Sequence, residues 1–540
     1  MDGALRLRPM RGTRHDPAWR RPTGPRRHAI AAFAAAVVLL AAPEGAVAQQ
    51  SAMPAIADSP TALALLEEAR AQAADNPVEA ARLARRLLDE YGDRVVPVDV
   101  DDDGEGLFAS AADEAERFLL AHPAVLARFR DAEGRAAERL LEADGPDATV
   151  RRRRFTRAGL DATMVLAERA LLEDRPGRAL ALLARIARHP DLSSGAVAHA
   201  ALAGQASARL GDAAASASAV AALEALGTDD ARLAAAQVAR TAPSTGAAGG
   251  PARSPLDHGA PVAAPDAGWR EIWSAPLEQP LFRRLFETSG PTVADSIVSR
   301  ARDNASWMTT VPVLRDGLVL VHEGTLIRAF DADARTERWS RQLSSGGVER
   351  DAGGVLDLCA LAVDRDAVVA FEGHAFANAR SGSARVWCLD AADGRVRWSV
   401  LLDGHEGRPE LEGLFPVGAP VVVGDTVVVA ARKPTTRLEQ VDWLVALDRA
   451  DGRVRWATSI AGAAGLRGLL GRRHAGLATD GDAVIVATPL GAVARVRVDD
   501  GGIAWLRRTA ASLREPRFLA EPWEVASPAL AGDRVIVVAP

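Results

Sequence analysis

The sequence predicts a chain of two parts, a helical repeat region followed by an all-β propeller. Four segments that end in Trp recur in the second half, at successive intervals of 59, 58 and 49 residues. Units of about 40–50 residues that each carry several strands are typical of propeller blades. The first half instead spaces its leucines and alanines three or four residues apart, which is the period of a helix.

Length and composition are those of an ordinary globular protein with more than one domain. The chain has 540 residues, of which 48% are hydrophobic and 25% charged, and its formal net charge is -6. Such a small charge on so long a chain gives no indication of nucleic-acid binding, so we expect no nucleic-acid partner. The oligomeric state is left open.

Residues 1–48 are interpreted as a signal peptide. An arginine-rich start precedes a short apolar stretch over 29–42, and Ala46-Val47-Ala48 forms a small-residue cleavage motif. The apolar stretch is shorter than the ~20 residues that a transmembrane helix needs. We therefore expect cleavage and no membrane span in the mature protein; the alternative is an uncleaved anchor. Arg26-Arg27 allows twin-arginine export, but its flanks match that motif poorly. We expect the general secretory route, and a location in the periplasm or cell envelope.

Residues 49–240 are predicted to form the helical domain. Pro77 opens a segment in which leucines recur at helical spacing, and Gly92 ends it. Two later units read as helix, turn, helix, with turns at 174–176 and at Gly211-Asp212. Their separation of about 37 residues is close to that of a tetratricopeptide repeat, so we predict a TPR-like region. The consensus Trp and Tyr of that repeat are absent, and a generic helical bundle is the alternative.

Two segments of biased composition lie beside or within this domain. The stretch over 241–268 is rich in Pro, Gly, Ala and Ser and has no apolar periodicity, so we predict a linker. Four consecutive arginines occupy 151–154, which we place at the start of a helix. Consecutive residues point in different directions around a helix, so we expect a solvated basic patch here.

One acidic segment resembles the start of a calcium-binding loop. Asp99, Asp101, Asp103 and Gly104 follow the D-x-D-x-D-G pattern. The twelfth position of that loop, where a Glu should supply two oxygens, is Ser110. An exposed acidic loop is therefore favoured over a calcium site.

Residues 269–540 are predicted to form the propeller. Runs of Val and Ile are divided by a Gly-Asp pair around Asp425, Asp482 and Asp533, which is a strong hairpin signal. A second hairpin turn precedes the Trp of three units, at Asp393-Gly394, Asp451-Gly452 and Asp500-Gly501. Two hairpins make the four strands of a blade, so we expect four complete blades and a partial fifth from Ser527. The segment around Trp273 could supply a last strand that closes a ring of about five blades, but we expect that the chain is truncated and the ring incomplete. The alternatives are a small ring or one completed by partners.

The pattern ALDRADGRVRW, preceded by GDTVVV, resembles the PQQ-like (pyrroloquinoline-quinone-type) repeat of quinoprotein alcohol dehydrogenases and of the outer-membrane assembly protein BamB. The resemblance covers about 269–540. It implies a structural role for the four Trp rings, which would fill the space between neighbouring blades: Trp339, Trp398, Trp456 and Trp505. A helical region ahead of such a propeller is similar to a group of exported bacterial proteins.

Only two cysteines occur, and both fall in the second unit. We place Cys359 on its first strand and Cys388 on its third. Strands two apart in a sheet are separated by about 10 Å, which is too far for a disulfide. Two small buried side chains are expected instead.

The resemblance allows two classes of function. A quinoprotein dehydrogenase would be expected to hold PQQ and calcium beside a catalytic Asp. The sequence has no adjacent Cys pair and no recognisable ligand cluster, so we assign no catalytic, cofactor-binding or metal residue. We expect a non-catalytic periplasmic scaffold, BamB-like in its propeller, that binds other envelope proteins through the loops at 373–383 and 433–442. The alternative is a PQQ-dependent dehydrogenase.

Overall fold

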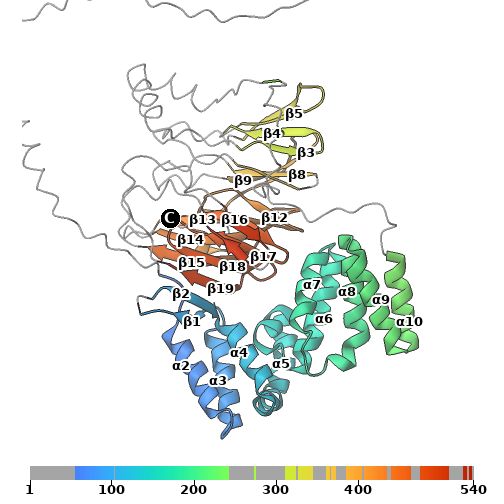
Figure 1. Cartoon of the computed structure of the whole chain (residues 1–540), viewed down its shortest axis with the longest axis vertical. Coiled ribbons are helices and arrows are strands. Elements are labelled where there is room, and N and C mark those ends of the chain that lie inside the picture. Colours follow the sequence, from blue (N-terminus) through green and yellow to red (C-terminus); the bar gives the residue numbers. More distant parts are fainter. Residues whose placement is uncertain are drawn as a thin grey trace, which may run out of the picture. The chain divides into compact units, whose positions relative to one another are not determined.

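The computed structural model has a helical N-terminal region followed by antiparallel sheets (Figure 1). This agrees with the predicted fold class. The residues that the structure describes are 55–102, 104–241, 273–274, 311–323, 326–343, 360–364, 366–371, 385–403, 405, 407–434, 440–463, 475–509, 527–531 and 534–537. The signal peptide, Cys359, Asp533, the loop at 373–383 and most of the predicted linker lie outside them.

The helices of the described part run from α2 to α10. Their bounds are α2 Pro60–Gln72, α3 Pro77–Glu90, α4 Ala111–Ala121, α5 Pro123–Arg153, α6 Arg157–Leu172, α7 Pro176–Arg185, α8 Ala196–Leu210, α9 Ala213–Leu226 and α10 Asp229–Thr241. A 3-10 turn, η1 (Leu192–Gly195), precedes α8. Among the described helices, none combines the length and the apolar character that crossing a bilayer requires.

The predicted helix signals act as expected. The side chain of Asn76 accepts the amide N–H of Glu79 at the start of α3, and Pro77 is its first residue. The leucines at helical spacing, Leu83, Leu87 and Leu88, are all buried. The pairs α6–α7 and α8–α9 are antiparallel helix pairs joined by the two predicted turns, and Gly211 adopts the left-handed conformation that ends α8.

The run of arginines contradicts its prediction as a solvated patch at a helix start. It lies at the C-terminal end of α5, after a kink at Gly145, and Arg153 and Arg154 are buried. Arg153 forms ion pairs with Asp89 and Glu133 at 2.6 and 2.8 Å, and Arg154 pairs with Glu116. Desolvation lowers the pKa of Arg154 to about 10. These side chains therefore tie α5 to α3 and α4.

The helical region contains a hairpin that the sequence analysis did not predict. Strands β1 (Val95–Val100) and β2 (Gly106–Ser110) pair antiparallel, and β2 also pairs with β19 (Ile503–Arg508) of the last blade. The result is a six-stranded sheet in the order β1-β2-β19-β18-β17-β16. In Figure 1 the blue hairpin lies beside the red strand β19. The N-terminal part thus adds two strands to a blade.

Four sheets of the C-terminal part supply the predicted blades. The first blade has β3 Val313–Arg315, β4 Leu318–His322, β5 Leu326–Asp331 and β6 Glu337–Gln342. The second has β7 Ala362–Asp364, β8 Ala367–Phe371, β9 Arg385–Asp390 and β10 Val396–Leu401. The third has β12 Val421–Val423, β13 Thr426–Pro434, β14 Gln440–Asp448 and β15 Val454–Ala463, with β11 Phe415–Pro416 beside β13. The fourth has β16 Gly476–Asp480, β17 Ala483–Ala487, β18 Ala492–Arg497 and β19.

One further hairpin follows the fourth blade, β20 (Ala529–Ala531) with β21 (Arg534–Ile536). It corresponds to the predicted start of a fifth unit. Of the segment predicted as a closing strand, only 273–274 are described, so that prediction stays untested; the ring of Trp273 lies 5.7 Å from that of Phe330 in the first blade. Cys388 is a buried free thiol on the third strand of the second blade, as predicted, and burial raises its pKa to about 11.

The two ends of the predicted contact loop at 433–442 lie in a sheet, and residues 435–439 lie outside the described part of the chain. The two ends belong to β13 and β14, and Lys433 pairs in register with Val441. Asp442, at the end of the predicted loop, forms a fully buried ion pair with Arg432 at 2.7 Å. Pairing lets both charges leave water without remaining isolated.

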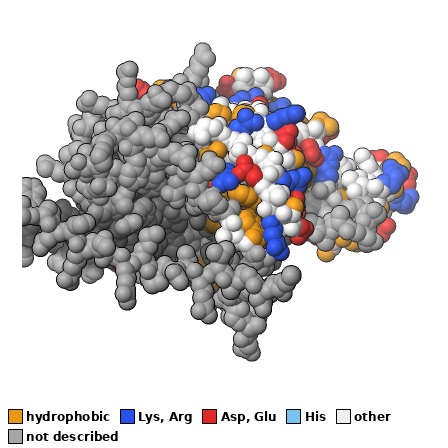
Figure 2. All heavy atoms as spheres, turned by 90° about the horizontal axis from the view of Figure 1, so that it is seen from above, with side chains coloured by type: hydrophobic (Ala, Val, Ile, Leu, Met, Phe, Trp, Pro, Cys, Tyr) orange, Lys and Arg blue, Asp and Glu red, His pale blue; other side chains and the backbone are white. Residues whose placement is uncertain are grey.

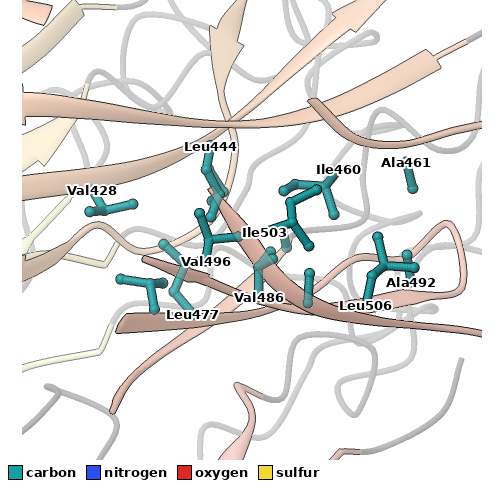
Figure 3. Packing of buried hydrophobic residues seen from close by; sticks show 14 of the residues in the cluster. Val428, Leu444, Ile460, Ala461, Leu477, Val486, Ala492, Val496, Ile503 and Leu506 are labelled. Atoms are coloured by element: carbon teal, nitrogen blue, oxygen red, sulfur yellow. The ribbon is translucent and has the colours of Figure 1, made fainter. Parts of the chain in front are cut away.

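The largest apolar cluster joins the third and fourth blades (Figure 3). Val428 and Leu444 from the third blade pack with Val486, Ile503 and Leu506 from the fourth. The hairpin contributes to the same cluster through Val95 and Phe108. Burial of apolar area therefore holds the hairpin on its blade in addition to the backbone hydrogen bonds.

Candidate functional site

The repeated Trp residues join each blade to the next. Trp339, Trp398 and Trp456 lie on the fourth strands β6, β10 and β15, and each is 8% exposed. Each indole Nε1–H donates to a backbone carbonyl of the following unit, at 2.8–3.0 Å; the acceptors are Ala391, Arg449 and Val498. The hydrogen bond satisfies the only polar atom of a ring that is otherwise packed between blades.

The glycine of each Asp-Gly turn lies against the Trp of the preceding blade. Gly394, Gly452 and Gly501 have φ values of 69°, 76° and 73°, which disfavour other residues. A Cβ at these positions would approach the rings of Trp339, Trp398 and Trp456 within 2.5, 2.6 and 2.6 Å. Glycine is therefore needed for two reasons: its backbone has a positive φ, and the neighbouring Trp ring leaves no space for a Cβ.

The aspartates of the same turns organise the backbone. Asp393, Asp451 and Asp500 accept the N–H two residues ahead, at 2.9, 2.9 and 2.8 Å. This is the Asx-type contact expected of aspartate in a turn. In the fourth blade, Asp500 has a second set of partners from the helices.

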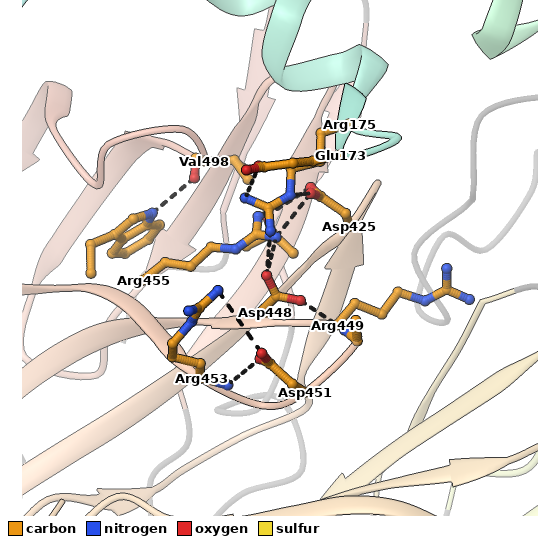
Figure 4. A network of polar contacts seen from close by, with 12 residues as sticks. Glu173, Arg175, Asp425, Asp448, Arg449, Asp451, Arg453, Arg455 and Val498 are labelled. Atoms are coloured by element: carbon orange, nitrogen blue, oxygen red, sulfur yellow. Dashed lines mark hydrogen bonds and ion pairs between the residues drawn. The ribbon is translucent and has the colours of Figure 1, made fainter. Parts of the chain in front are cut away.

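An arginine from the helical region contacts the rim of the third blade, which is the end of the blade that carries Asp425 and Asp448 (Figure 4). Arg455 of β15 contacts Asp425 and Asp448 at 2.8 and 2.9 Å. Arg175, in the turn between α6 and α7, contacts the same two carboxylates at 2.5 Å each. Two guanidinium groups thus alternate with two carboxylates at the place where a helical-repeat turn meets a blade.

The other end of α7 contacts the fourth blade in the same way. Arg185 lies 2.7 Å from Asp500 and 3.6 Å from Asp499. Arg497 joins Asp500 at 3.1 Å to Asp113 of α4 at 2.6 Å. Both ends of one helix are therefore fixed to the blade rim by charged hydrogen bonds, which are stronger than neutral ones.

The carboxyl groups of the rim differ in the direction in which their surroundings shift the pKa. Burial opposes ionisation of Asp448 and Asp500, but arginine contacts outweigh it, so the pKa of each lies below its usual value. Asp499 is the opposite case: burial, with the charge of Asp500, raises the pKa of Asp499. The rim is therefore anionic at Asp448 and Asp500, and protonation of Asp499 is favoured by its surroundings.

A cleft of about 370 Å³ lies between α5–α7 and this rim. Its apolar lining comes from Val150, Leu166, Leu182, Val454 and Trp456. Six arginines and four aspartates form the charged part of the lining: Arg151, Arg175, Arg178, Arg185, Arg453, Arg455, Asp147, Asp448, Asp499 and Asp500. On the face shown in Figure 2, acidic and basic side chains likewise lie interspersed rather than in patches of one sign.

The second blade shows that the arginine arrangement recurs. Arg397, directly before Trp398, contacts Asp366 and Asp390 at 2.6 and 2.7 Å. Arg449 of the third blade adds a contact to Asp366 at 2.6 Å. On the second blade the additional arginine, Arg449, comes from the neighbouring third blade. On the third blade the additional arginine, Arg175, comes from the helical region.

The sequence analysis missed these arginines. The recurring Arg-Trp pairs at 397–398 and 455–456 are a signal that could have identified Arg397 and Arg455. No such signal exists for Arg175 and Arg185, because their partners on the blades lie some 250 to 315 positions further along the chain.

The residues of the predicted calcium loop lie partly on a strand and partly in a turn. Asp99 lies on β1, and Asp101 accepts the N–H of Glu105 at 2.8 Å in the hairpin turn; Asp103 lies outside the described residues. Within the described ranges, no group of three or more His, Cys, Asp or Glu side chains could hold a metal. The calcium hypothesis stays an untested prediction.

The carboxylates on the first strands of the blades already have partners. The resemblance to quinoproteins implies that a quinone cofactor and its calcium would lie on the central axis of the propeller. Asp364 on β7 faces Arg449 at 3.6 Å, and Asp480 on β16 pairs with Arg495 at 2.9 Å. Carboxylates neutralised by arginine do not fit a calcium-ligand set.

Comparison with known proteins supports the repeat assignment. Residues 440–540 match the family model described as outer membrane protein assembly factor BamB, which supports the predicted PQQ-like repeats in that part of the chain. No curated protein matches the chain.

Three solved structures show similarity to parts of the chain. BamB from Moraxella catarrhalis is 19% identical with a TM-score of 0.23, over 37% of this chain and 47% of that one. Quinohemoprotein alcohol dehydrogenase from Comamonas testosteroni is 17% identical with a TM-score of 0.27, over 38% and 35%. Europium-containing methanol dehydrogenase is 16% identical with a TM-score of 0.28, over 37% and 41%. The matches thus span less than half the length of each.

Proposed function

We propose that this chain is an exported, non-catalytic scaffold that binds other proteins of the cell envelope and is BamB-like in its propeller. The observation that carries the proposal is the attachment of a helical repeat region to a blade rim. Arg175 and Arg185 fix both ends of α7, and β2 continues the sheet of the fourth blade. A fixed cleft between two repeat surfaces is suited to recognising another chain, since a preformed surface loses little entropy on binding.

The envelope location is part of the same proposal. It is supported by the match to a family model named after an outer-membrane assembly factor and by the predicted signal peptide. The proposed route is general secretion followed by cleavage after Ala48.

A quinone-dependent oxidoreductase is not proposed as a second function. The described first-strand carboxylates are held by arginines, and no other observation favours that chemistry. The proposal assigns the chain neither PQQ nor calcium.

The test is site-specific cross-linking in the envelope of a bacterium that produces the full chain. A photoreactive residue is placed at Arg453, which lines the cleft and is 71% exposed, and at Arg395 as a control. Arg395 precedes Trp398 by the same three residues, is 82% exposed and does not line the cleft. Discrete protein adducts are expected from position 453 and fewer from position 395. Absence of adducts from both, together with stoichiometric uptake of PQQ and calcium and dye-linked alcohol oxidation, would overturn the proposal.

A further inference from the structure

The cleft has unused positive charge. Asp448 is contacted by Arg175 and Arg455, and Asp500 by Arg185 and Arg497, so these carboxylates are neutralised within the protein. Arg175, Arg185 and Arg455 are fully engaged in these pairs, since Arg175 and Arg455 also contact Asp425 outside the lining. An occupant that supplied carboxylates would instead meet the remaining lining arginines, Arg151, Arg178 and Arg453.

Three of the lining arginines have weak or no partners. Arg178 has a 3.5 Å contact with Asp147, and its Nε is buried with no hydrogen-bond partner among the described residues. Arg453 lies 3.9 Å from Asp451, which is an ion pair without a hydrogen bond. Arg151 is exposed and forms no ion pair within the described part of the chain. Their guanidinium groups are available to an incoming carboxylate.

The apolar lining determines what kind of anion fits. Leu166 and Leu182 from the helices face the same cavity as Val454 and Trp456 from the blade. A purely polar anion such as a free phosphate would leave this surface uncovered. A peptide that alternates carboxylates with an aliphatic side chain would use both parts of the lining.

We propose that this cleft binds a short acidic peptide segment of a partner protein, with an aliphatic side chain on the Leu166–Trp456 surface and carboxylates on Arg151, Arg178 and Arg453. The volume of about 370 Å³ lies at the lower end of the ~300–1,000 Å³ range of ligand pockets, so it admits a few side chains and no folded domain. This inference rests on the proposed scaffold function and names the chemistry of its partner.

The experiment is a fluorescence-anisotropy titration of the full chain with a labelled, end-blocked Glu-Leu-Glu-Glu peptide. Saturable binding is expected, weakened about tenfold by Arg178→Gln or Arg453→Gln, since one charged hydrogen bond is worth about a factor of ten. Arg152→Gln and Arg395→Gln serve as controls, because both residues are exposed and neither lines the cleft. Binding should also fall between 50 mM and 500 mM salt.

Several results would overturn the inference. Equal binding of the Gln-Leu-Gln-Gln peptide would exclude charge recognition, and unchanged binding in both cleft variants would place the site elsewhere. Competition by succinate at peptide-like concentrations would identify a small-molecule site instead. Should Arg178→Gln lose its native circular dichroism, the exposed Arg453→Gln carries the test. Envelope adducts without peptide binding would refute this inference alone, whereas absence of adducts bears on the scaffold itself.

Discussion

Trp456 and Trp505 end the same repeat motif, yet the structure surrounds them differently. The ring of Trp456 is 8% exposed, rests on Gly501 and donates to the carbonyl of Val498. Trp505 is only partly buried, and the strand beside it is β2, in which Ala109 lies opposite. The repeat motif therefore specifies a strand that carries a Trp ring, whereas the element packed beside that strand determines how far the ring is buried and what it contacts. In the fourth blade that neighbouring strand comes from the helical region.

The largest expected difference separates these two rings. Trp456→Ala should lower the free energy of unfolding by about 3–5 kcal/mol, because it opens a cavity between the third and fourth blades. Trp505→Ala should cost about 1–2 kcal/mol, since its ring is partly exposed already. Urea denaturation followed by circular dichroism measures both. Equal losses would show that the two rings have equivalent surroundings.

The glycine below a docked ring gives the next effect. Gly452→Ala combines a positive φ of 76° with a clash against Trp398, so we expect a loss of about 2–4 kcal/mol. Gly424→Ala is the matched control: its φ is 60°, but the space around its Cβ is open. It should lose only about 1 kcal/mol, for the backbone alone. If Gly424→Ala lost as much unfolding free energy as Gly452→Ala, contact with the Trp398 ring would not explain the effect.

The contacts that attach the helices to the rim should contribute less to the free energy of unfolding than the Trp rings and the glycines beside them. Arg175→Ala removes contacts with Asp425 and Asp448 while Arg455 stays in place, so about 1–3 kcal/mol is expected. Arg395→Ala, at an 82% exposed arginine, should change stability by under about 0.5 kcal/mol. Thermal unfolding monitored in the helical region tests this pair, and the attachment is refuted if Arg175→Ala behaves like the control.

The smallest effect is a dependence on pH. The pKa of Asp448 is lower in the folded chain than its ordinary value of 3.8, so its contribution is present above that value. It is lost as the pH falls through the folded-state pKa. Asp448→Asn should therefore reduce the loss of stability between about pH 4 and pH 2. A variant that loses stability as steeply as the parent would contradict the assignment.

Local patterns predicted most of the secondary structure, because they depend on neighbouring residues. Pro77 begins α3, and Asp451-Gly452 turns between β14 and β15, as their signals indicate. The hairpin β1–β2 was missed because its acidic turn suggested an exposed loop and its partner strand β19 lies about 400 residues later. The burial of Arg153 and Arg432 was missed for the same reason, since the sequence shows the charges but not the carboxylates that meet them.

The cleft itself was beyond sequence reasoning. Its lining combines α5, α6 and α7 with turns of two blades, and no local pattern places Arg178 beside Trp456. The Asp-Gly turns did indicate the rim, because aspartate organises turns wherever they occur. The second role of Asp500, as the partner of Arg185, depends on the contact between the two regions.

That contact is the central claim, and hydrogen exchange of the full-length chain tests it most directly. Amides of β2 should be protected to the same degree as those of β19, because Leu107 and Phe108 pair with Arg507 and Leu506 in one sheet. Peptides over 106–110 and 503–508, separated by mass spectrometry, report the two strands. The account predicts slow exchange in both. Rapid exchange over 106–110 beside a protected β18 would show that the helical region is not joined to the blade.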